Sequence, residues 1–318
     1  MKKYPSIEQY RNIIRKVRTN HDFQGNVDKE PVYEHLSPYP TLKFRGTIKL
    51  HGTNAAIVLY KEKGIKYQSR ERELSLEKDN AGFMLAMSSK DTSSLFEGLE
   101  FTDYIAVYGE WCGGNIQSGV ALTQLPKMFV IFGYDIDGKW VDIDRDITDL
   151  GIFNISRFKT YEIDIDFNEP EAIQNQLIEW TEEVENECPF AKSFGVSGIG
   201  EGIVFTSVLY PELKFKSKGE KHSSSKVKVL NSVNTEELAN IQEFVEYAVT
   251  ESRLEQGLNY LKENNLDMSQ KSTGQFLSWI FNDIIKEESD TIVSNQIDLK
   301  KANGLIASKA RMWFFKHF

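Results

Sequence analysis

The sequence is poor in the residues that build metal centres and disulfide frameworks. Its 318 residues include two cysteines, Cys112 and Cys188, and five scattered histidines, and neither set shows the close pairing of a metal-binding motif. These counts exclude a zinc ribbon or a disulfide-stabilised secreted domain. Two free thiols suit a reducing cytosol, so we expect a cytoplasmic protein.

Long apolar runs and strong positive charge are lacking as well. The opening Met1–Pro5 is not followed by an apolar stretch as long as a signal peptide, and no segment resembles a membrane span. A net charge of −9 argues against a general nucleic-acid coat. The stretch from Lys214 to Lys228 is different, since it holds six lysines against the single acid Glu220, and it predicts a local surface for phosphates.

The most informative segment runs from Lys49 to Asn54. Apolar residues precede it and Ala55–Tyr60 follows it, so it indicates a turn between two strands. Desolvation or nearby cations lower the pKa of a lysine at the end of a buried strand, which makes its amine a nucleophile. Gly52 lets the backbone approach a ligand closely, and Asn54 offers hydrogen bonds to a sugar or phosphate. Taken alone, this pattern is more often an ordinary hairpin with a solvated lysine.

Further strand-like fragments follow the lysine turn, and most of them carry a charged residue at one end. They are Ile65–Arg70, Tyr104–Glu110, Phe129–Ile136, Glu201–Phe205 and Leu213–Lys216. In the last of these, two lysines alternate onto one face of the strand. Each fragment alone is weak, but an ordered set is much more specific than any of its members.

In this order the fragments resemble the motifs of the covalent nucleotidyltransferases, which are the polynucleotide ligases and the messenger-RNA capping enzymes. His51 stands where DNA ligases and capping enzymes usually have aspartate. The chain is therefore most similar to the phage-type RNA ligases that seal nicks in duplex RNA, over roughly residues 1 to 230. The resemblance implies an α+β fold, in which an adenylyltransferase domain of antiparallel sheets and flanking helices occupies residues 1–232.

The resemblance also implies roles for the charged residues. Lys49 is the nucleophile that attacks the α-phosphate of ATP, and Lys214 and Lys216 contact the phosphates and help to depress the pKa of Lys49. Glu110 hydrogen-bonds the ribose. Glu201 lies near the phosphate, where it can hold a hydrated Mg²⁺ through water.

Three more positions match the family's nucleotide contacts. Arg70 corresponds to an arginine that contacts ribose or phosphate. Tyr134 corresponds to the aromatic residue that stacks on adenine, and Phe132, two residues earlier on the same predicted face, is the alternative if the register differs. His51 supports the steps after adenylylation or is a structural histidine, and both interpretations stay open.

Two positions depart from the closest relatives. Some relatives carry glutamate directly before the nucleophile, whereas this chain has Ile48, so adenine recognition must depend more on backbone groups there. The usual lysine after Val204 is also missing, because Phe205 and Thr206 stand in its place. One phosphate contact is then absent or supplied from elsewhere.

Residues 233–318 have helical rather than strand periodicity, which predicts a small all-helical C-terminal domain. Asn234 can cap the first helix, and Glu237 can reach back to its amide. The apolar stripes are Leu254, Leu258 and Leu261, then Phe276, Trp279, Ile280 and Ile284, then Ile306, Ala310, Trp313 and Phe314. DNA ligases and capping enzymes usually have a β-barrel here, so the helices favour the RNA ligase branch, where they brace the core or engage RNA.

The sequence thus predicts an ATP-dependent RNA ligase that works through a lysyl-AMP intermediate and an adenylylated RNA 5′-end. We expect ATP with Mg²⁺ or Mn²⁺ as cofactors, and RNA with 3′-hydroxyl and 5′-phosphate ends, as in a nicked duplex, as substrate. A monomer in the cytoplasm of a bacterium or of the host of a phage is expected. The alternatives are a catalytically silent RNA-binding module and a DNA ligase or capping-type nucleotidyltransferase.

Overall fold

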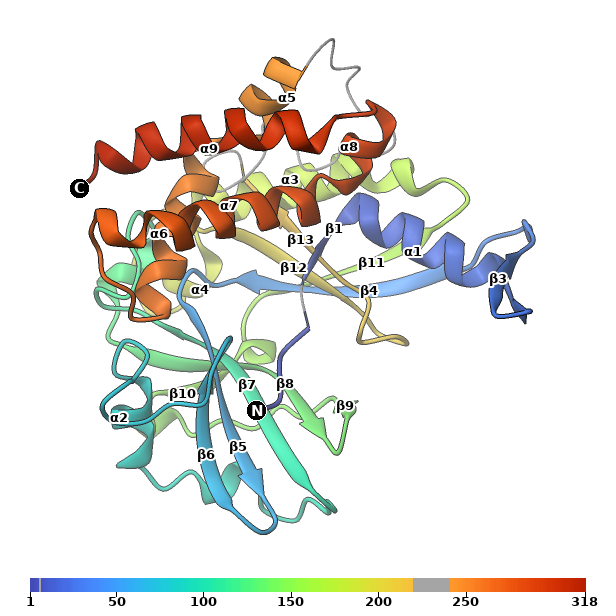
Figure 1. Cartoon of the computed structure of the whole chain (residues 1–318). Helices are drawn as coiled ribbons and strands as arrows, with labels where there is room; N and C mark the ends of the chain where they lie inside the picture. The colour runs from blue at the N-terminus through green and yellow to red at the C-terminus, as the bar shows by residue number, and fades with distance from the viewer. Residues whose placement is uncertain (6, 220–240) are drawn as a thin grey trace.

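The structure is a computed structural model that describes residues 1–5, 7–219 and 241–318. Two β-sheets lie one above the other, and a group of C-terminal helices stands over them (Figure 1). Neighbouring strands are antiparallel except for one short parallel edge strand in each sheet. The predicted α+β class, with antiparallel sheets, flanking helices and a helical C-terminal region, is confirmed.

The first sheet has five strands and carries Lys49. In order across the sheet, the strands are β1 (Glu8–Gln9), β13 (Lys214–Lys218), β12 (Gly202–Ser207), β4 (Thr41–Lys49) and β11 (Thr160–Asp166). Burial alternates along β4, where Leu42, Phe44 and Ile48 are buried but Thr47 and Lys49 are half-buried. Since successive side chains of a strand point to opposite faces, Lys49 projects away from the core that Ile48 enters.

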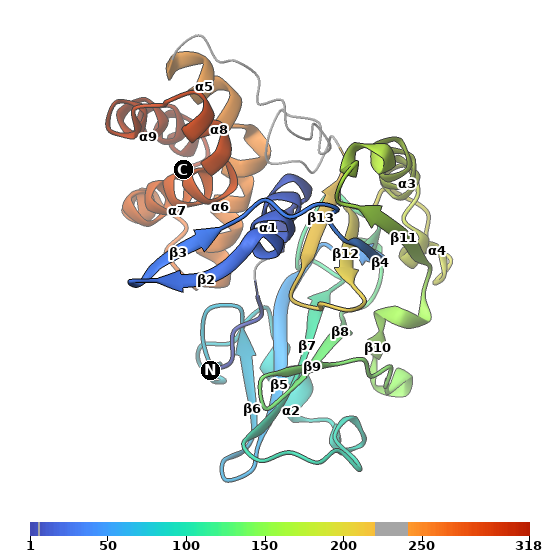
Figure 2. The same cartoon turned by 90° about the vertical axis from the view of Figure 1, so that its right-hand side faces the viewer.

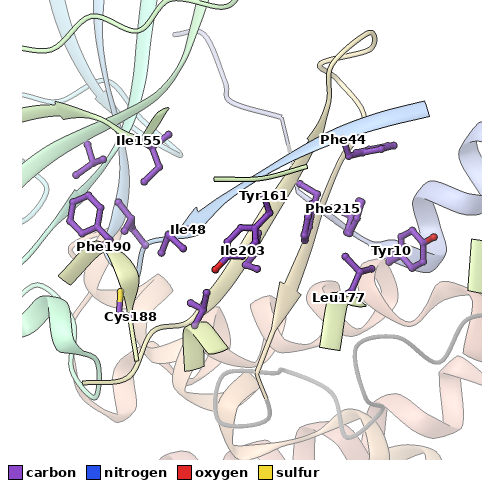
Figure 3. Close-up of a cluster of buried hydrophobic side chains, with 14 of the residues drawn as sticks. Tyr10, Phe44, Ile48, Ile155, Tyr161, Leu177, Cys188, Phe190, Ile203 and Phe215 are labelled. Atoms are coloured by element: carbon purple, nitrogen blue, oxygen red, sulfur yellow. The ribbon is translucent and has the colours of Figure 1, made fainter. Parts of the chain in front are cut away.

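Two helices cover the core face of this sheet, α1 (Tyr10–Asp22) and α3 (Gln174–Asn186). Figure 3 shows Tyr10 from α1 and Leu177 from α3 beside Phe44 and Phe215 of the sheet. All four side chains are almost completely removed from water, and burial of large apolar side chains stabilises a fold by roughly 2 kcal/mol each. This core fixes the strand on which Lys49 sits.

The sequence from Pro5 to Arg18 predicts a short amphipathic helix with Ile13, Ile14 and Val17 on one side, and helix α1 buries all three. It begins at Tyr10 rather than near Pro5. The reason is that Glu8 and Gln9 pair with β13 as strand β1, so the chain stays extended up to Tyr10. A pairing with a distant strand overrides the local helical pattern.

The second sheet is six-stranded. Its strands are β10 (Ile152–Asn154), β8 (Met128–Ile136), β7 (Tyr104–Cys112), β5 (Thr53–Tyr60) and β6 (Gly64–Ser69) in order, with β9 (Lys139–Val141) paired to β8. Strand β5 follows β4 directly, so the chain passes from one sheet to the other at residues 50–52. The lysine turn therefore joins the two sheets.

A β-bulge interrupts the pairing of β7 with β8. Tyr108 pairs with Gly133 and Gly109 pairs with Ile131, which leaves Phe132 without a partner in the ladder. An extra residue reverses the facing of every residue beyond it. Ile131 and Tyr134 consequently enter the same core cluster, and Phe132 lies on the other face of the sheet.

The C-terminal helices, called the helical domain below, pack around a hydrophobic cluster of their own. They are α5 (Ile241–Ala248), α6 (Glu251–Glu263), α7 (Thr273–Glu287), α8 (Ser289–Ser294) and α9 (Leu299–Phe315). The predicted apolar stripes on α6, α7 and α9 supply much of this core. The predicted boundary at residue 233 and the helix start at Asn234 and Glu237 lie outside the described residues. Figure 2 shows the domain on one side of the five-stranded sheet and α3 on the other.

The remaining elements are short. They are the ribbon of β2 (Phe23–Val27) and β3 (Glu30–Tyr33), the helices α2 (Phe83–Ser88) and α4 (Pro189–Lys192), and single turns of 3₁₀-helix at Ser93–Leu95, Ala121–Gln124, Thr148–Leu150, Ile155–Arg157, Pro170–Ile173 and Gln270–Ser272. Within the described part of the chain, no helix has both the length and the apolar character to cross a bilayer.

Candidate active site

A cavity of about 1400 Å³ opens where the two sheets and the helical domain meet. The predicted site residues that line it are Ile48, Lys49, His51, Asn54, Arg70, Glu110, Glu201 and Lys216. Phe132, the alternative to Tyr134, lines it too. The structure thus gathers residues that lie more than 160 positions apart in the chain.

Lys49 and Glu201 line this cavity and form an ion pair with each other. The Nζ of Lys49 donates a hydrogen bond to Glu201 Oε2 at 2.7 Å. The Nζ of Lys218 lies 2.9 Å from the other carboxylate oxygen, and His51 Nδ1 lies 3.3 Å from Oε2. One buried carboxylate therefore holds three basic side chains together.

Strand register explains this meeting. Gly202 on β12 is paired with Lys49 on β4 and with Lys218 on β13, so Glu201 stands beside both lysines. Gly202 has a φ of +146°, and a Cβ on it would lie 2.0 Å from the carbonyl oxygen of Ser217. No residue with a side chain fits this position, so the glycine allows the close approach of the strands that brings the charges together.

Burial and charge shift the protonation of this pair. Burial lowers the pKa of Lys49, and the charge of Lys218 lowers it further, while Glu201 opposes both effects. For Glu201, burial alone would raise the pKa, but Lys218, Lys49 and His51 hold it well below its usual value. The carboxylate stays ionised, and the amine of Lys49 is easier to deprotonate than an ordinary lysine.

Glu110 lies on the opposite wall of the cavity, on β7. It accepts a hydrogen bond from the backbone N–H of Gly52 at 3.1 Å, and it pairs across the sheet with Asn54. A Cβ on Gly52 would lie 2.4 Å from the carbonyl oxygen of Trp111, so only glycine lets the turn pack here. Burial raises the pKa of Glu110 to about 8.

The prediction that Tyr134 stacks on adenine needs correction. Tyr134 is completely buried in the core of the six-stranded sheet and does not line the cavity. Phe132 lines it instead and packs edge-on against Tyr4, with ring centroids 4.8 Å apart. The bulge at Phe132 puts these two aromatic residues on opposite faces, although a regular strand would have kept them on one.

The lysines of strand β13 that line the cavity are not the two that the sequence predicted. Lys214 is buried outside the cavity lining, with its ammonium 4.9 Å from the ring centroid of Trp140 and 5.5 Å from that of Tyr4. Burial lowers its pKa to about 8. Lys216 and Lys218 line the cavity, so the lysine pair at the site is shifted by two residues from the predicted pair.

The other predicted residues occupy the edges of the cavity. Arg70 is exposed at the end of β6, and Ile48 lines the cavity although its side chain packs in the core (Figure 3). Thr206, which stands where relatives have a lysine, lines the cavity as well. Lys218 brings a positive charge to the site that the sequence interpretation did not assign.

The helical domain forms the remaining wall of the cavity, which no pattern in the sequence predicted. Its contributing side chains include Glu263 on α6, Trp279, Lys286 and Glu287 on α7, and Trp313 on α9. Trp279 and Trp313 belong to the predicted apolar stripes, whereas Glu263, Lys286 and Glu287 are charged residues outside them. Contacts between distant domains leave no local signal in the chain.

The site suits a metal ion that arrives with phosphates better than one held by the protein alone. Among the described residues, no group of three or more histidine, cysteine, aspartate or glutamate side chains could hold a metal. Glu201 is an ionised carboxylate in the cavity, and Mg²⁺ usually keeps several waters and needs only one or two carboxylates beside its phosphates. A hydrated ion reached through water therefore fits this donor set.

The comparison with protein families decides the membership of the chain. A sequence model of the RNA ligase family matches residues 43–228, which is more than half of the chain. The chain belongs to the RNA ligase family. The matched range contains Lys49, Glu110, Glu201 and Lys218 of this RNA ligase family member, and excludes its helical domain. The family predicted from the ordered motifs is confirmed.

Solved structures of an RNA ligase from Naegleria gruberi also match. For the enzyme with pyrophosphate, the identity is 16% and the TM-score 0.45, and the match covers 70% of this chain and 56% of that one. A variant with AMP and manganese gives 18% identity and a TM-score of 0.46, again over 70% and 56%. This RNA ligase family member thus matches little more than half the length of that enzyme. A comparison with curated proteins found no match.

Proposed function

We propose that this chain is an ATP-dependent RNA ligase that joins an RNA 3′-hydroxyl to a 5′-phosphate. The observation that carries the proposal is the amine of Lys49, which faces the cavity 2.7 Å from Glu201 Oε2 with a second cation, Lys218, on the same carboxylate. Burial lowers the pKa of Lys49, as nucleophilic lysines require. Membership of the RNA ligase family supports the same assignment.

In the first step, Lys49 Nζ attacks the α-phosphorus of ATP. A P–N bond forms, the P–O bond to pyrophosphate breaks, and Glu201 Oε2 lies within reach of the proton that the amine releases. Lys216 and Lys218 supply positive charge where negative charge develops on the phosphates. This is the phosphate-binding role that the sequence assigns to Lys214 and Lys216, moved along the strand by two residues.

The later steps use the same cavity. An oxygen of the RNA 5′-phosphate attacks the lysyl-AMP, the P–N bond breaks, and Lys49 recovers its proton. The 3′-hydroxyl then attacks the activated 5′-phosphate, a phosphodiester forms and AMP leaves. His51, 3.3 Å from Glu201, is close enough to act in these steps, and it also serves to hold the carboxylate in place.

The nucleoside is assigned to the six-stranded sheet. Phe132 offers its ring to adenine, Glu110 and Asn54 offer hydrogen bonds to the ribose, and Arg70 at the rim contacts ribose or phosphate. Backbone groups near Ile48 complete adenine recognition. Mg²⁺ or Mn²⁺, bound with the ATP phosphates and reached by Glu201 through water, would neutralise phosphate charge.

The domain division belongs to the proposal too. Residues up to about 232 make the adenylyltransferase unit, and residues from about 233 make the helical domain that lines the cavity and meets RNA. A nick in duplex RNA is the proposed substrate and a monomer the proposed form.

The test is adduct formation with ATP labelled on the α-phosphate. Purified chain, Lys49→Ala and Lys49→Arg are incubated with ATP and Mg²⁺ and run on denaturing gels. Lys49→Arg keeps the positive charge beside Glu201 but has no nucleophilic amine, so it separates chemistry from structure. We expect a labelled band in the wild type and in neither variant.

A second assay tests which nucleotide and which kind of 3′-end the protein uses. Nicked duplexes with ribose or deoxyribose at the 3′-end are sealed in parallel, with ATP or GTP supplied. Preference for GTP or for a deoxyribose end would contradict the proposal and favour a capping-type or DNA-joining enzyme. RNA binding without any adduct, after bound AMP has been removed with pyrophosphate, would mean a silent binding module.

A further inference from the structure

Lys216, which the proposed function assigns to the ATP phosphates, is paired with the helical domain. Its Nζ lies 3.1 Å from Oε1 of Glu287, the last residue of α7. The two side chains are 20% and 6% exposed, so water screens their interaction only in part. Both residues line the cavity. The charge that should meet a phosphate is thus neutralised by a carboxylate.

The surroundings of Glu287 keep its carboxylate ionised. Gln9 Nε2 donates a hydrogen bond to its second oxygen at 2.8 Å. Burial alone would raise the pKa of Glu287, but Lys216 and the hydrogen bond from Gln9 hold it at about 2. At neutral pH the carboxylate is therefore fully ionised.

A second set of charges fixes the end of α7 to helix α1. Arg11 on α1 lies 2.9 Å from one oxygen of Glu288, and Arg253 on α6 lies 2.9 Å from the other. Arg11 also donates to the carbonyl oxygen of Glu287 at 2.6 Å. This network holds the backbone of Glu287 in place, so the carboxylate reaches Lys216 from a fixed point.

The helical domain also touches the far wall of the cavity. Glu263, the last residue of α6, accepts a hydrogen bond from the hydroxyl of Thr53 and faces the charge of Arg70. Asn265 donates to the carbonyl oxygen of Asp79 at 3.0 Å. The domain consequently bridges both sheets, and at each end an acidic side chain faces a basic residue proposed to bind nucleotide.

We infer that the docked helical domain guards the cavity against ATP, because the Glu287 carboxylate takes the place of a nucleotide phosphate on Lys216. This inference rests on the proposed function. A carboxylate and a phosphate compete for the same ammonium group, and the triphosphate would also be repelled by Glu287. ATP must therefore displace Glu287 from Lys216, and the free energy of that displacement is subtracted from its binding.

The opposite role for Glu287 makes the opposite prediction. If Glu287 held Lys216 in the position that phosphate needs, its neutralisation would weaken nucleotide binding. The direction of the change on Glu287→Gln therefore separates guarding from positioning. Glutamine keeps the size of the side chain and can still accept a hydrogen bond from Gln9 or Lys216.

The experiment measures the Kd of an ATP analogue with a methylene bridge between its α- and β-phosphates, by calorimetry with Mg²⁺. Such an analogue binds without reacting. We expect Glu287→Gln to bind it about five- to tenfold more tightly than the wild type, within the usual range for coupled sites. The matched control is Glu246→Gln, because Glu246 pairs with Lys309 at 2.8 Å within the helical domain and does not line the cavity. It should leave the Kd unchanged.

Two further variants sharpen the result. Glu287→Asp keeps the charge and should bind like the wild type or more tightly than it, but more weakly than Glu287→Gln. In a Lys216→Met background, Glu287→Gln should increase the affinity for the analogue less than about twofold, because Glu287 and phosphate no longer compete for Lys216. A five- to tenfold increase in affinity in that background would mean that Glu287 acts by general charge repulsion, and it would overturn the role of the Lys216 contact. Thermal unfolding of every variant checks that it is folded.

An unchanged or weaker affinity in folded Glu287→Gln would overturn the inference. Adduct formation with labelled ATP is run beside the binding assay. Analogue binding without an adduct would refute the proposed function, while the comparison of affinities would still test the guard. If neither wild type nor variant binds the analogue, both the proposed function and the guard are refuted.

Discussion

Lys218 offers the sharpest test of the site, because its neighbour Lys214 is a matched control on the same strand. The resemblance assigns phosphate contacts to Lys214 and Lys216. The structure instead puts the Lys218 ammonium 2.9 Å from Glu201, beside Lys49, and leaves Lys214 against Trp140 outside the cavity. We therefore compare Lys218→Ala with Lys214→Ala.

The magnitude follows from what each ammonium contacts. Lys218→Ala removes a fixed cation from the phosphate end of the site, and loss of one such group costs about 10²- to 10³-fold in rate, or about 2.7–4 kcal/mol. It also removes a charge that lowers the pKa of Lys49, so less free amine is present near neutral pH. Lys214→Ala loses contacts with two aromatic rings, worth roughly 0.5–2 kcal/mol of stability, and should keep the rate within about threefold.

The assay is single-turnover formation of the protein–AMP adduct at saturating ATP, stopped by acid and followed on gels. Circular dichroism and urea unfolding establish that both variants are folded at the assay temperature. An equal loss of rate in the two folded variants, or a larger loss of rate in Lys214→Ala, would refute the assignment of Lys218 to the phosphates. A Lys218→Arg variant should recover part of the rate, since it restores the charge.

Three other predictions concern the walls of the cavity. Gly52→Ala should lower the free energy of unfolding by about 1–3 kcal/mol, because its Cβ would lie 2.4 Å from the Trp111 carbonyl oxygen; urea titration measures this. Phe132→Ala should raise the Kd for ATP about tenfold or more, corresponding to roughly 1.5 kcal/mol of ring contact, whereas Tyr134→Phe should leave it unchanged; calorimetry on both decides which aromatic faces the base. Glu110 has a pKa of about 8 in the fold against 4.5 for the ordinary group, so its ionisation destabilises the folded state as pH rises between these values. From pH 5 to pH 8, the free energy of unfolding of the wild type should therefore fall by at least about 1 kcal/mol more than that of Glu110→Gln. Urea titrations measure both proteins, and an equal fall in the two would contradict the raised pKa of Glu110.

Local patterns predicted the strands and the turn after Lys49 well, since both depend on neighbours in the chain. Alternating burial in β4 and the turn at Gly52 follow directly from residue types, and the structure places Lys49, Glu110 and Glu201 in one cavity. The choice between Lys214, Lys216 and Lys218 could not be made in this way. All three alternate on one strand, and only pairing with Gly202 decides which of them meets Glu201.

The bulge at Phe132 had a weak signal that the sequence interpretation did not use. Gly133 follows Phe132 inside a strand, and glycine in a strand often marks a bulge or a close approach. Periodicity assumes an unbroken ladder, so it placed Phe132 and Tyr134 on one face. The docking of Glu287 on Lys216 had no signal at all, because it joins residues 71 positions apart through the packing of a whole domain.

The passage of the chain between sheets at residues 50–52 has a consequence for how this site can change. The proposed phosphate end, with Lys49, Glu201 and Lys218, belongs to the five-stranded sheet, and the proposed nucleoside end, with Phe132 and Glu110, belongs to the six-stranded sheet. The residues proposed for base recognition and for transfer chemistry therefore lie on separate sheets, which the chain connects at residues 50–52 and again at residues 155–159. A library of substitutions confined to β7 and β8 could alter which nucleotide the site accepts and leave the transfer machinery intact.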